Sequence, residues 1–151
     1  METENFWPSS EDILNAEEES PLTILKEQQE YLSKSFPSLD SRIQIVYTIG
    51  KEGSLFSQNF LGMSIKPQEI SRCRFVVCKL IVFKKGMKYE CEILRIRYSI
   101  DDHYPLEVMG IDIPLEYTVD TKEAFMNTLK NIFNSDRCKE SLRYMLLGRL
   151  K

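Results

Sequence analysis

Two long runs of β-branched and other apolar residues constrain the fold more than any other part of this 151-residue chain. A short lysine- and glycine-containing segment at residues 84–87 separates the two runs, and this pattern predicts a β-hairpin over residues 72–100. The first run contains Lys79 and is about half as long as a membrane-spanning segment. We therefore expect it to form a strand.

The alternation of apolar and polar residues also predicts how the two strands pair. With Lys85-Gly86 as a two-residue loop, the register places opposite each other Val82 and Tyr89, Leu80 and Cys91, and Cys78 and Ile93. One face is then apolar, and Lys79 pairs with Glu92 on the other face. The apolar positions change parity after Ile93, so we expect either a β-bulge or cover on both faces at that end.

Helix signals flank the strands on both sides. Three helices are expected: residues 21–36 with Ser20 as cap and Pro21 first, 120–134 starting at Asp120, and 136–148 with Ser135 as cap. Further strands are expected at residues 43–49, 55–65 and 106–109. Because the helices and the hairpin-linked strands are segregated, the expected fold is α+β, with an antiparallel sheet of four to five strands and helices packed on one face.

The length is that of one domain, preceded by a compositionally distinct arm. Residues 1–20 are expected to form an acidic, partly ordered arm, and residues 21–151 a single α+β domain. Trp7, the only tryptophan, is expected to anchor the arm on this domain, because large aromatic side chains supply buried area. The first residues lack the features of a secretory signal, so we expect a cytoplasmic protein.

The net charge of −3 conceals a strong segregation of charge. Residues 1–40 carry −8, residues 41–100 carry +7, and residues 101–151 carry −2. This pattern indicates either a surface for a charged partner or an acidic arm that lies against the basic middle of the chain. The cations of the hairpin form the candidate interaction surface: Arg72, Arg74, Lys84, Lys85, Lys88, Arg95 and Arg97.

Aromatic residues between these cations would also suit the stacking of single-stranded nucleic acid. Two features weigh against that interpretation. The isoelectric point near 5.3 is far below that of typical nucleic-acid-binding domains. The lysines at the hairpin tip also serve to protect a sheet edge. Nucleic-acid binding through residues 72–98 is therefore kept as an alternative.

A second candidate site is the acidic loop after the hairpin, which contains Asp101, Asp102, His103 and Tyr104. Three adjacent residues cannot all converge on one ion, and His103 is the only histidine of the chain. We therefore expect no metal, and the absence of nucleotide-binding and hydrolase motifs gives no reason to expect an organic cofactor. A small-ligand binder or enzyme that uses this loop is a further alternative.

The four cysteines show no metal-binding or disulfide spacing, so reduced thiols are expected. In the predicted register Cys78 and Cys91 lie diagonally across the hairpin on its apolar face. They are either a redox pair or two small core residues, and the core interpretation is favoured because free cysteine is among the most buried residue types. Cys73 falls on the outward-facing set and is the more exposed thiol.

Residues 21–32 (PLTILKEQQEYL) resemble the helix that opens a group of small bacterial cytoplasmic proteins with no established activity. The resemblance extends over about residues 21–113 and includes the Tyr104-Pro105 pair. The chain departs from that group at residues 35–38 (SFPS), where a polar turn containing glycine would be expected. The resemblance implies an α+β fold and a bacterial, cytoplasmic setting, and it brings no site residues.

These observations favour a non-enzymatic protein-interaction module, by analogy with small acidic proteins that block a partner as immunity proteins do. The expected partner is another protein, with no membrane association. The sequence identifies neither the partner nor the oligomeric state.

Deletion of residues 1–20 removes seven acidic residues and no basic ones, which changes the formal charge from −3 to +4. If the arm screens the basic middle, the truncated protein should stay folded and gain weak, salt-sensitive binding to a single-stranded oligonucleotide. Binding is measured for both forms at low and moderate salt. An unchanged affinity after truncation would show that the arm does not screen these cations.

Overall fold

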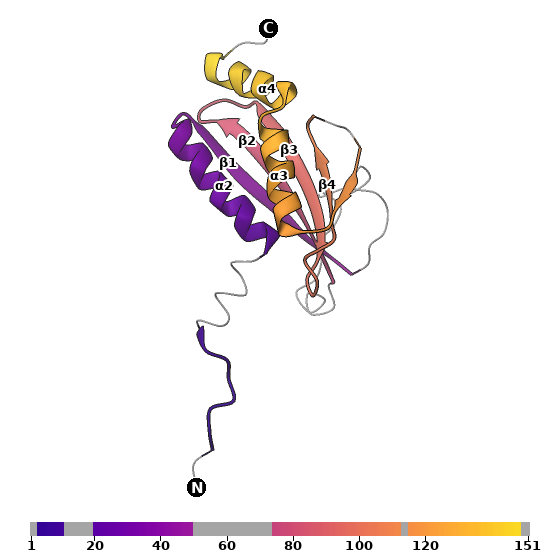
Figure 1. Cartoon of the computed structure of the whole chain (residues 1–151). Coiled ribbons are helices and arrows are strands. Elements are labelled where there is room, and N and C mark those ends of the chain that lie inside the picture. Colours follow the sequence, from indigo (N-terminus) through magenta and orange to yellow (C-terminus); the bar gives the residue numbers. More distant parts are fainter. Residues whose placement is uncertain (1–2, 11–19, 50–73, 113–114, 149–151) are drawn as a thin grey trace.

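The structure, a computed structural model, describes residues 3–10, 20–49, 74–112 and 115–148. Within these residues five antiparallel strands form one sheet whose spatial order follows the chain: β1 (Leu39–Thr48), β2 (Phe75–Lys84), β3 (Glu90–Ser99), β4 (Leu106–Gly110) and β5 (Tyr117–Val119). Three helices lie on one face of the sheet (Figure 1): α2 (Pro21–Ser35), α3 (Lys122–Phe133) and α4 (Asp136–Leu147). The predicted α+β class is therefore confirmed.

Local capping chemistry explains where two of the helices begin. Ser20 Oγ accepts a hydrogen bond of 3.2 Å from the Thr23 amide at the start of α2, and Pro21 occupies the first helical position. Ser135 Oγ accepts one of 3.3 Å from the Cys138 amide at the start of α4. Both helix starts agree with the sequence prediction.

Single residues also set the end of α4 and the start of α3. Helix α4 ends at Gly148, whose left-handed φ of 71° suits glycine. Helix α3 begins at Lys122 rather than at residue 120, because Thr121 instead of Asp120 supplies the cap and accepts from the Ala124 amide at 3.1 Å. The short strand β5 immediately before it was missed.

The predicted hairpin exists, but its register is wrong by two residues. Val82 lies opposite Cys91 rather than Tyr89. The cause is the turn: the Met87 amide donates to the Lys84 carbonyl, and only Gly86, at φ 85°, has a positive φ. A tight two-residue type I′ turn needs positive φ at both central residues, which Lys85 does not adopt. The connection therefore runs on to Tyr89 before β3 begins.

A β-bulge then changes the register within the hairpin. Ile81 pairs with Glu92 and Leu80 pairs with Leu94, which leaves Ile93 as the extra residue. Ile93 and Leu94 both belong to the buried cluster beneath the helices. The bulge is one of the two outcomes that the change of parity predicted, and it lets two consecutive apolar residues be buried on the same side.

The core lies between the sheet and the helices. Helix α2 packs on β1, α3 on β3, and α4 on β2. The largest fully buried side chains include Leu25 from α2, Phe125 and Ile132 from α3, and Met145 from α4. The backbone of β4 approaches α3 so closely that a Cβ on Gly110 would lie 2.8 Å from the Ile132 side chain and 2.5 Å from Asp112 Oδ1.

The opposite face of the sheet carries a row of ion pairs. Arg42 of β1 binds Glu90 of β3 through two hydrogen bonds of 2.6 and 2.7 Å. Glu92 lies between two cations, with Lys79 Nζ at 3.8 Å and a hydrogen bond of 3.1 Å from Arg95 Nη2. The predicted Lys79–Glu92 pair is thus confirmed, although Lys79 stands directly opposite Arg95 in the ladder.

The last ion pair of this row is the most buried. Arg97 of β3 pairs with Glu107, its direct neighbour on β4, and their side chains are 4% and 14% exposed. A guanidinium this buried is stable only with a carboxylate partner, because desolvation of a charge is costly. The pair therefore ties β4 to the centre of the sheet.

The strands predicted outside the hairpin agree with the structure in part. The strand predicted at residues 43–49 begins earlier, at Leu39, and the one at 106–109 is β4. The strand predicted at residues 55–65 lies outside the described residues. None of the described helices is both long enough and apolar enough to cross a bilayer.

The prediction that Trp7 anchors the arm is wrong. Phe6 and Trp7 are both 83% exposed, and all of residues 3–10 are exposed. The Trp7 amide donates a hydrogen bond of 3.1 Å to Asn5 Oδ1, which is a contact within the arm itself.

We predict that Glu107→Ala destabilises the protein strongly, by about 3 kcal/mol, because it removes the carboxylate from a buried guanidinium. The matched control is Glu90→Ala, which breaks the exposed pair with Arg42 and should have a much smaller effect. Urea denaturation of both variants and the wild type gives the comparison. Equal losses of stability would show that burial does not set the strength of these pairs.

Candidate functional site

The helix-covered face contains a groove between α2 on one side and the junction of α3 and α4 on the other. Its volume is about 370 Å³. Three of the side chains that line the groove are small: Ser35 at the end of α2, Ser41 on β1, and Cys138 in the first turn of α4. Ser41 stands in the inward-facing row of β1, between Leu39 and Ile43, which both contact the core. Larger residues at these positions would fill the space.

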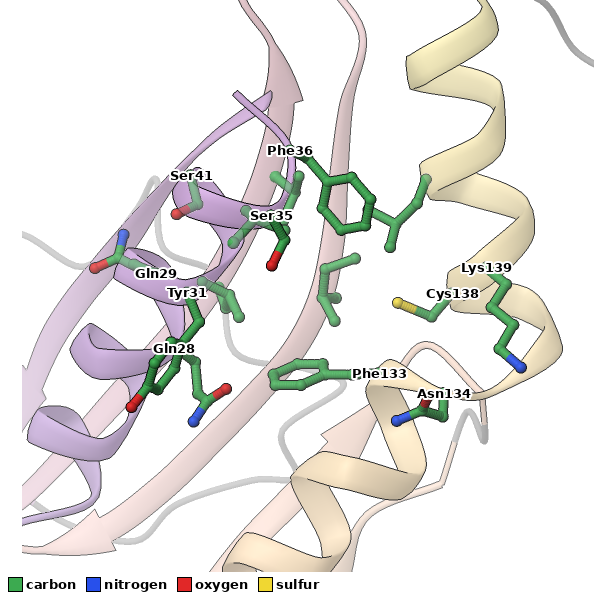
Figure 2. A pocket seen from close by; sticks show the side chains of 15 residues that line it. Gln28, Gln29, Tyr31, Ser35, Phe36, Ser41, Phe133, Asn134, Cys138 and Lys139 are labelled. Atoms are coloured by element: carbon green, nitrogen blue, oxygen red, sulfur yellow. The ribbon is translucent and has the colours of Figure 1, made fainter. Parts of the chain in front are cut away.

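The interior of the groove is apolar. Leu80, Val82 and Ile93 from the central strands form its floor, and Ile93 is the residue that the bulge adds. The walls consist of Leu32, Phe36, Phe133 and Leu142. Figure 2 shows the Phe36 and Phe133 rings on different sides of the cavity, with the Cys138 sulfur directed toward the space between them. The interior can therefore receive an apolar group.

Polar side chains surround this apolar interior. Tyr31, Ser35, Asn134 and Lys139 line the groove and are exposed, so they form its rim (Figure 2). Gln28 and Gln29 add two further amides from α2. Lys139 carries the only charge among the described residues that line the groove. The rim offers hydrogen bonds to a polar backbone, whereas the interior offers none of the charged groups that most catalysis requires.

The Cys138 thiol is shielded although it lines the groove. Its residue is 2% exposed, and burial is the main reason that its pKa rises to about 11, with nearby Cys91 and Asp112 adding to the effect. A thiol with this pKa stays protonated near neutral pH, so it is a poor nucleophile. Cys138 therefore contributes to the groove as a small apolar residue.

The two hairpin cysteines occupy the core, as the favoured interpretation predicted. Cys78 is fully buried and Cys91 is 7% exposed, and burial raises the pKa of both thiols, that of Cys78 to about 12. They are not diagonal neighbours, which corrects the predicted register: Cys78 pairs with Ile96, and Cys91 pairs with Val82. Cys73 lies outside the described residues.

The structure separates the cations of the candidate interaction surface. Arg95 and Arg97 lie mid-sheet in ion pairs with Glu92 and Glu107. Lys84, Lys85 and Lys88 lie at the turn of the hairpin. Arg74 is exposed just before β2, at the opposite end of the hairpin. Arg72 lies outside the described residues. Among the described cations of this surface, the turn lysines alone form a local group.

The acidic loop does not converge on a site. Asp101 and Asp102 are exposed, and both of their backbone amides donate to Ser99 Oγ, at 3.2 and 3.3 Å. His103 packs edge-on against the Tyr98 ring, with 5.7 Å between ring centroids. Among the described residues, no group of three or more histidine, cysteine or acidic side chains is arranged to hold a metal ion.

Tyr104 is the one member of this loop with an unusual environment. Its hydroxyl is buried and has no hydrogen-bond partner within the described part of the chain, and burial raises its pKa. The loop offers less to a ligand than the groove does.

Sequence reasoning missed the groove, although one signal was present. A serine at position 41 interrupts an otherwise apolar inward row of β1. Ser41 indicates a groove only when the end of α2 and the start of α4 are known to lie above the same part of the sheet.

Comparison with protein-family models, with curated proteins and with solved structures found no match for this chain. The resemblance of residues 21–32 to a bacterial group therefore stays a prediction.

The thiols offer a direct test of the site's electrostatics. We predict that alkylation of Cys138 in the native protein is slow near neutral pH and accelerates with each pH unit until about pH 11, because the thiolate is the reactive form. Cys78 should react more slowly still. Mass spectrometry of labelled peptides over a pH series measures both rates, with the unfolded protein as control. A rate for Cys138 that levels off near pH 9 would show an ordinary, unshielded thiol.

Proposed function

We propose that this chain is a non-enzymatic protein-interaction module that binds a large apolar side chain of a partner protein in the groove between α2 and the α3–α4 junction. The observation that carries the proposal is the combination of an apolar floor and walls with an exposed polar rim. Interfaces between proteins share this anatomy, since an apolar centre is surrounded by polar groups at the edge.

The distribution of polar groups favours a peptide over a small molecule. The volume of about 370 Å³ would suit either. Small-molecule sites, however, orient their ligand with polar groups that converge inside the pocket. Here Ser35, Asn134 and Lys139 are exposed at the rim, where a peptide backbone would pass.

The rim also offers an aromatic contact. Tyr31 is 59% exposed beside the groove on α2. Tyrosine is among the residue types that contribute most to binding energy, because its side chain buries a large area with few rotatable bonds. The partner chemistry that fits is thus an aromatic or large aliphatic side chain on a segment with a free polar backbone.

Selection from a random-peptide display library tests the proposal. Peptides that bind the full chain should share at least one large aromatic or aliphatic residue, and the Leu142→Arg variant should bind them at least about tenfold more weakly. Leu147→Arg is the matched control, since Leu147 lies on the same helix, is 59% exposed and does not line the groove. Peptides that bind both variants equally would place the interaction elsewhere.

A second variant tests whether the empty space itself is functional. We predict that Ser41→Val fills part of the groove, raises stability by about 0.5–2 kcal/mol, and weakens binding of the selected peptides. Gln44→Val is the control, because it makes a β-branched substitution on the same strand but on the opposite face. Thermal denaturation and peptide titration measure both effects. Undiminished binding by Ser41→Val would contradict the assignment of the groove.

A further inference from the structure

The N-terminal arm presents two adjacent aromatic side chains without cover. Phe6 and Trp7 are each 83% exposed, whereas the other residues of the described arm are polar or small, apart from Pro8. Aromatic residues exposed in this way are typical of segments that dock into a pocket, because the two rings gain buried area only on binding. The arm therefore has the chemistry that the proposed function requires of a partner.

We propose that the groove of one chain receives the Phe6–Trp7 pair of a second copy's arm. The inference rests on the proposed function, because it uses the same groove. The volume fits: a cavity of about 150 Å³ holds a benzene ring, and this one is more than twice as large, at about 370 Å³. Phe36 and Phe133 supply rings for edge-to-face packing against an indole.

The polar surroundings fit the same occupant. A buried indole N–H needs an acceptor, and the amides of Gln28 and Asn134 line the groove. Glu4 lies two residues before Phe6, and Lys139 is the charged side chain at the rim. Opposite charges on the two segments favour the encounter and fix its direction.

A second copy is the favoured source of the arm because the chain does not seat these rings in its own groove. Each chain has one arm and one groove, so two copies can exchange arms reciprocally in a closed, symmetric dimer. After the first arm docks, the second docking is intramolecular and has a raised effective concentration. The exchange therefore strengthens two individually small contacts.

Trp7 makes the test direct, since it is the only tryptophan of the chain and all tryptophan emission reports on it. The full chain is examined between about 1 μM and about 1 mM by fluorescence, and its mass is followed by sedimentation equilibrium. We expect the emission maximum to move to shorter wavelength as the mass rises from monomer to dimer. Leu142→Arg should raise the dissociation constant at least about tenfold, and Leu147→Arg should leave it unchanged.

Each outcome decides the inference. If Leu142→Arg does not fold, Ser41→Val serves instead, and it too should weaken the dimer. A shifted emission at every concentration in a monomer would place Trp7 in its own chain and overturn the exchange. Exposed emission throughout, with library peptides still bound in the groove, would overturn this inference alone. Exposed emission and no groove-dependent peptide binding would overturn the proposed function as well.

Discussion

The β-bulge at Ile93 is the local constraint on which the arrangement of core and groove depends. Before it, alternate residues of β3 face the helices; after it, the alternation restarts one residue later, at Leu94. A regular strand would turn one of these two neighbours toward the ion pairs on the other face. With the bulge, both join the buried cluster, and Ile93 becomes part of the floor of the groove.

The two faces of the sheet consequently differ in the groups that lie on them. One face carries a row of complementary charges, which runs from Arg42 and Glu90 to the buried pair of Arg97 and Glu107. The other is closed by helices that meet imperfectly above Ser41. Ion pairs need defined partners and geometry, whereas a gap between helices accepts any apolar group of suitable size. This contrast places the candidate binding site on the helical face.

Much of the fold could be predicted from the sequence because its signals are local. Ser20 with Pro21, Ser135 and Gly148 mark helix ends through bonds within one turn, and the change of parity near Ile93 indicated a bulge. The hairpin register was wrong because it depends on the φ that Lys85 adopts, which residue type alone does not determine. The groove was missed because it depends on a gap between elements far apart in the sequence.

Gly110 of β4 affects the width of the groove although it does not line it. Since β4 has no side chain there, α3 rests almost against the strand, with Ile132 fully buried at the contact. Phe133, the next residue of α3, forms a wall of the groove. The absence of a side chain at Gly110 therefore sets the distance between β4 and α3. A larger residue at position 110 would push α3 away from β4 and shift the wall that Phe133 forms. The width of the groove, and with it the range of side chains that fit, would change although no lining residue is substituted.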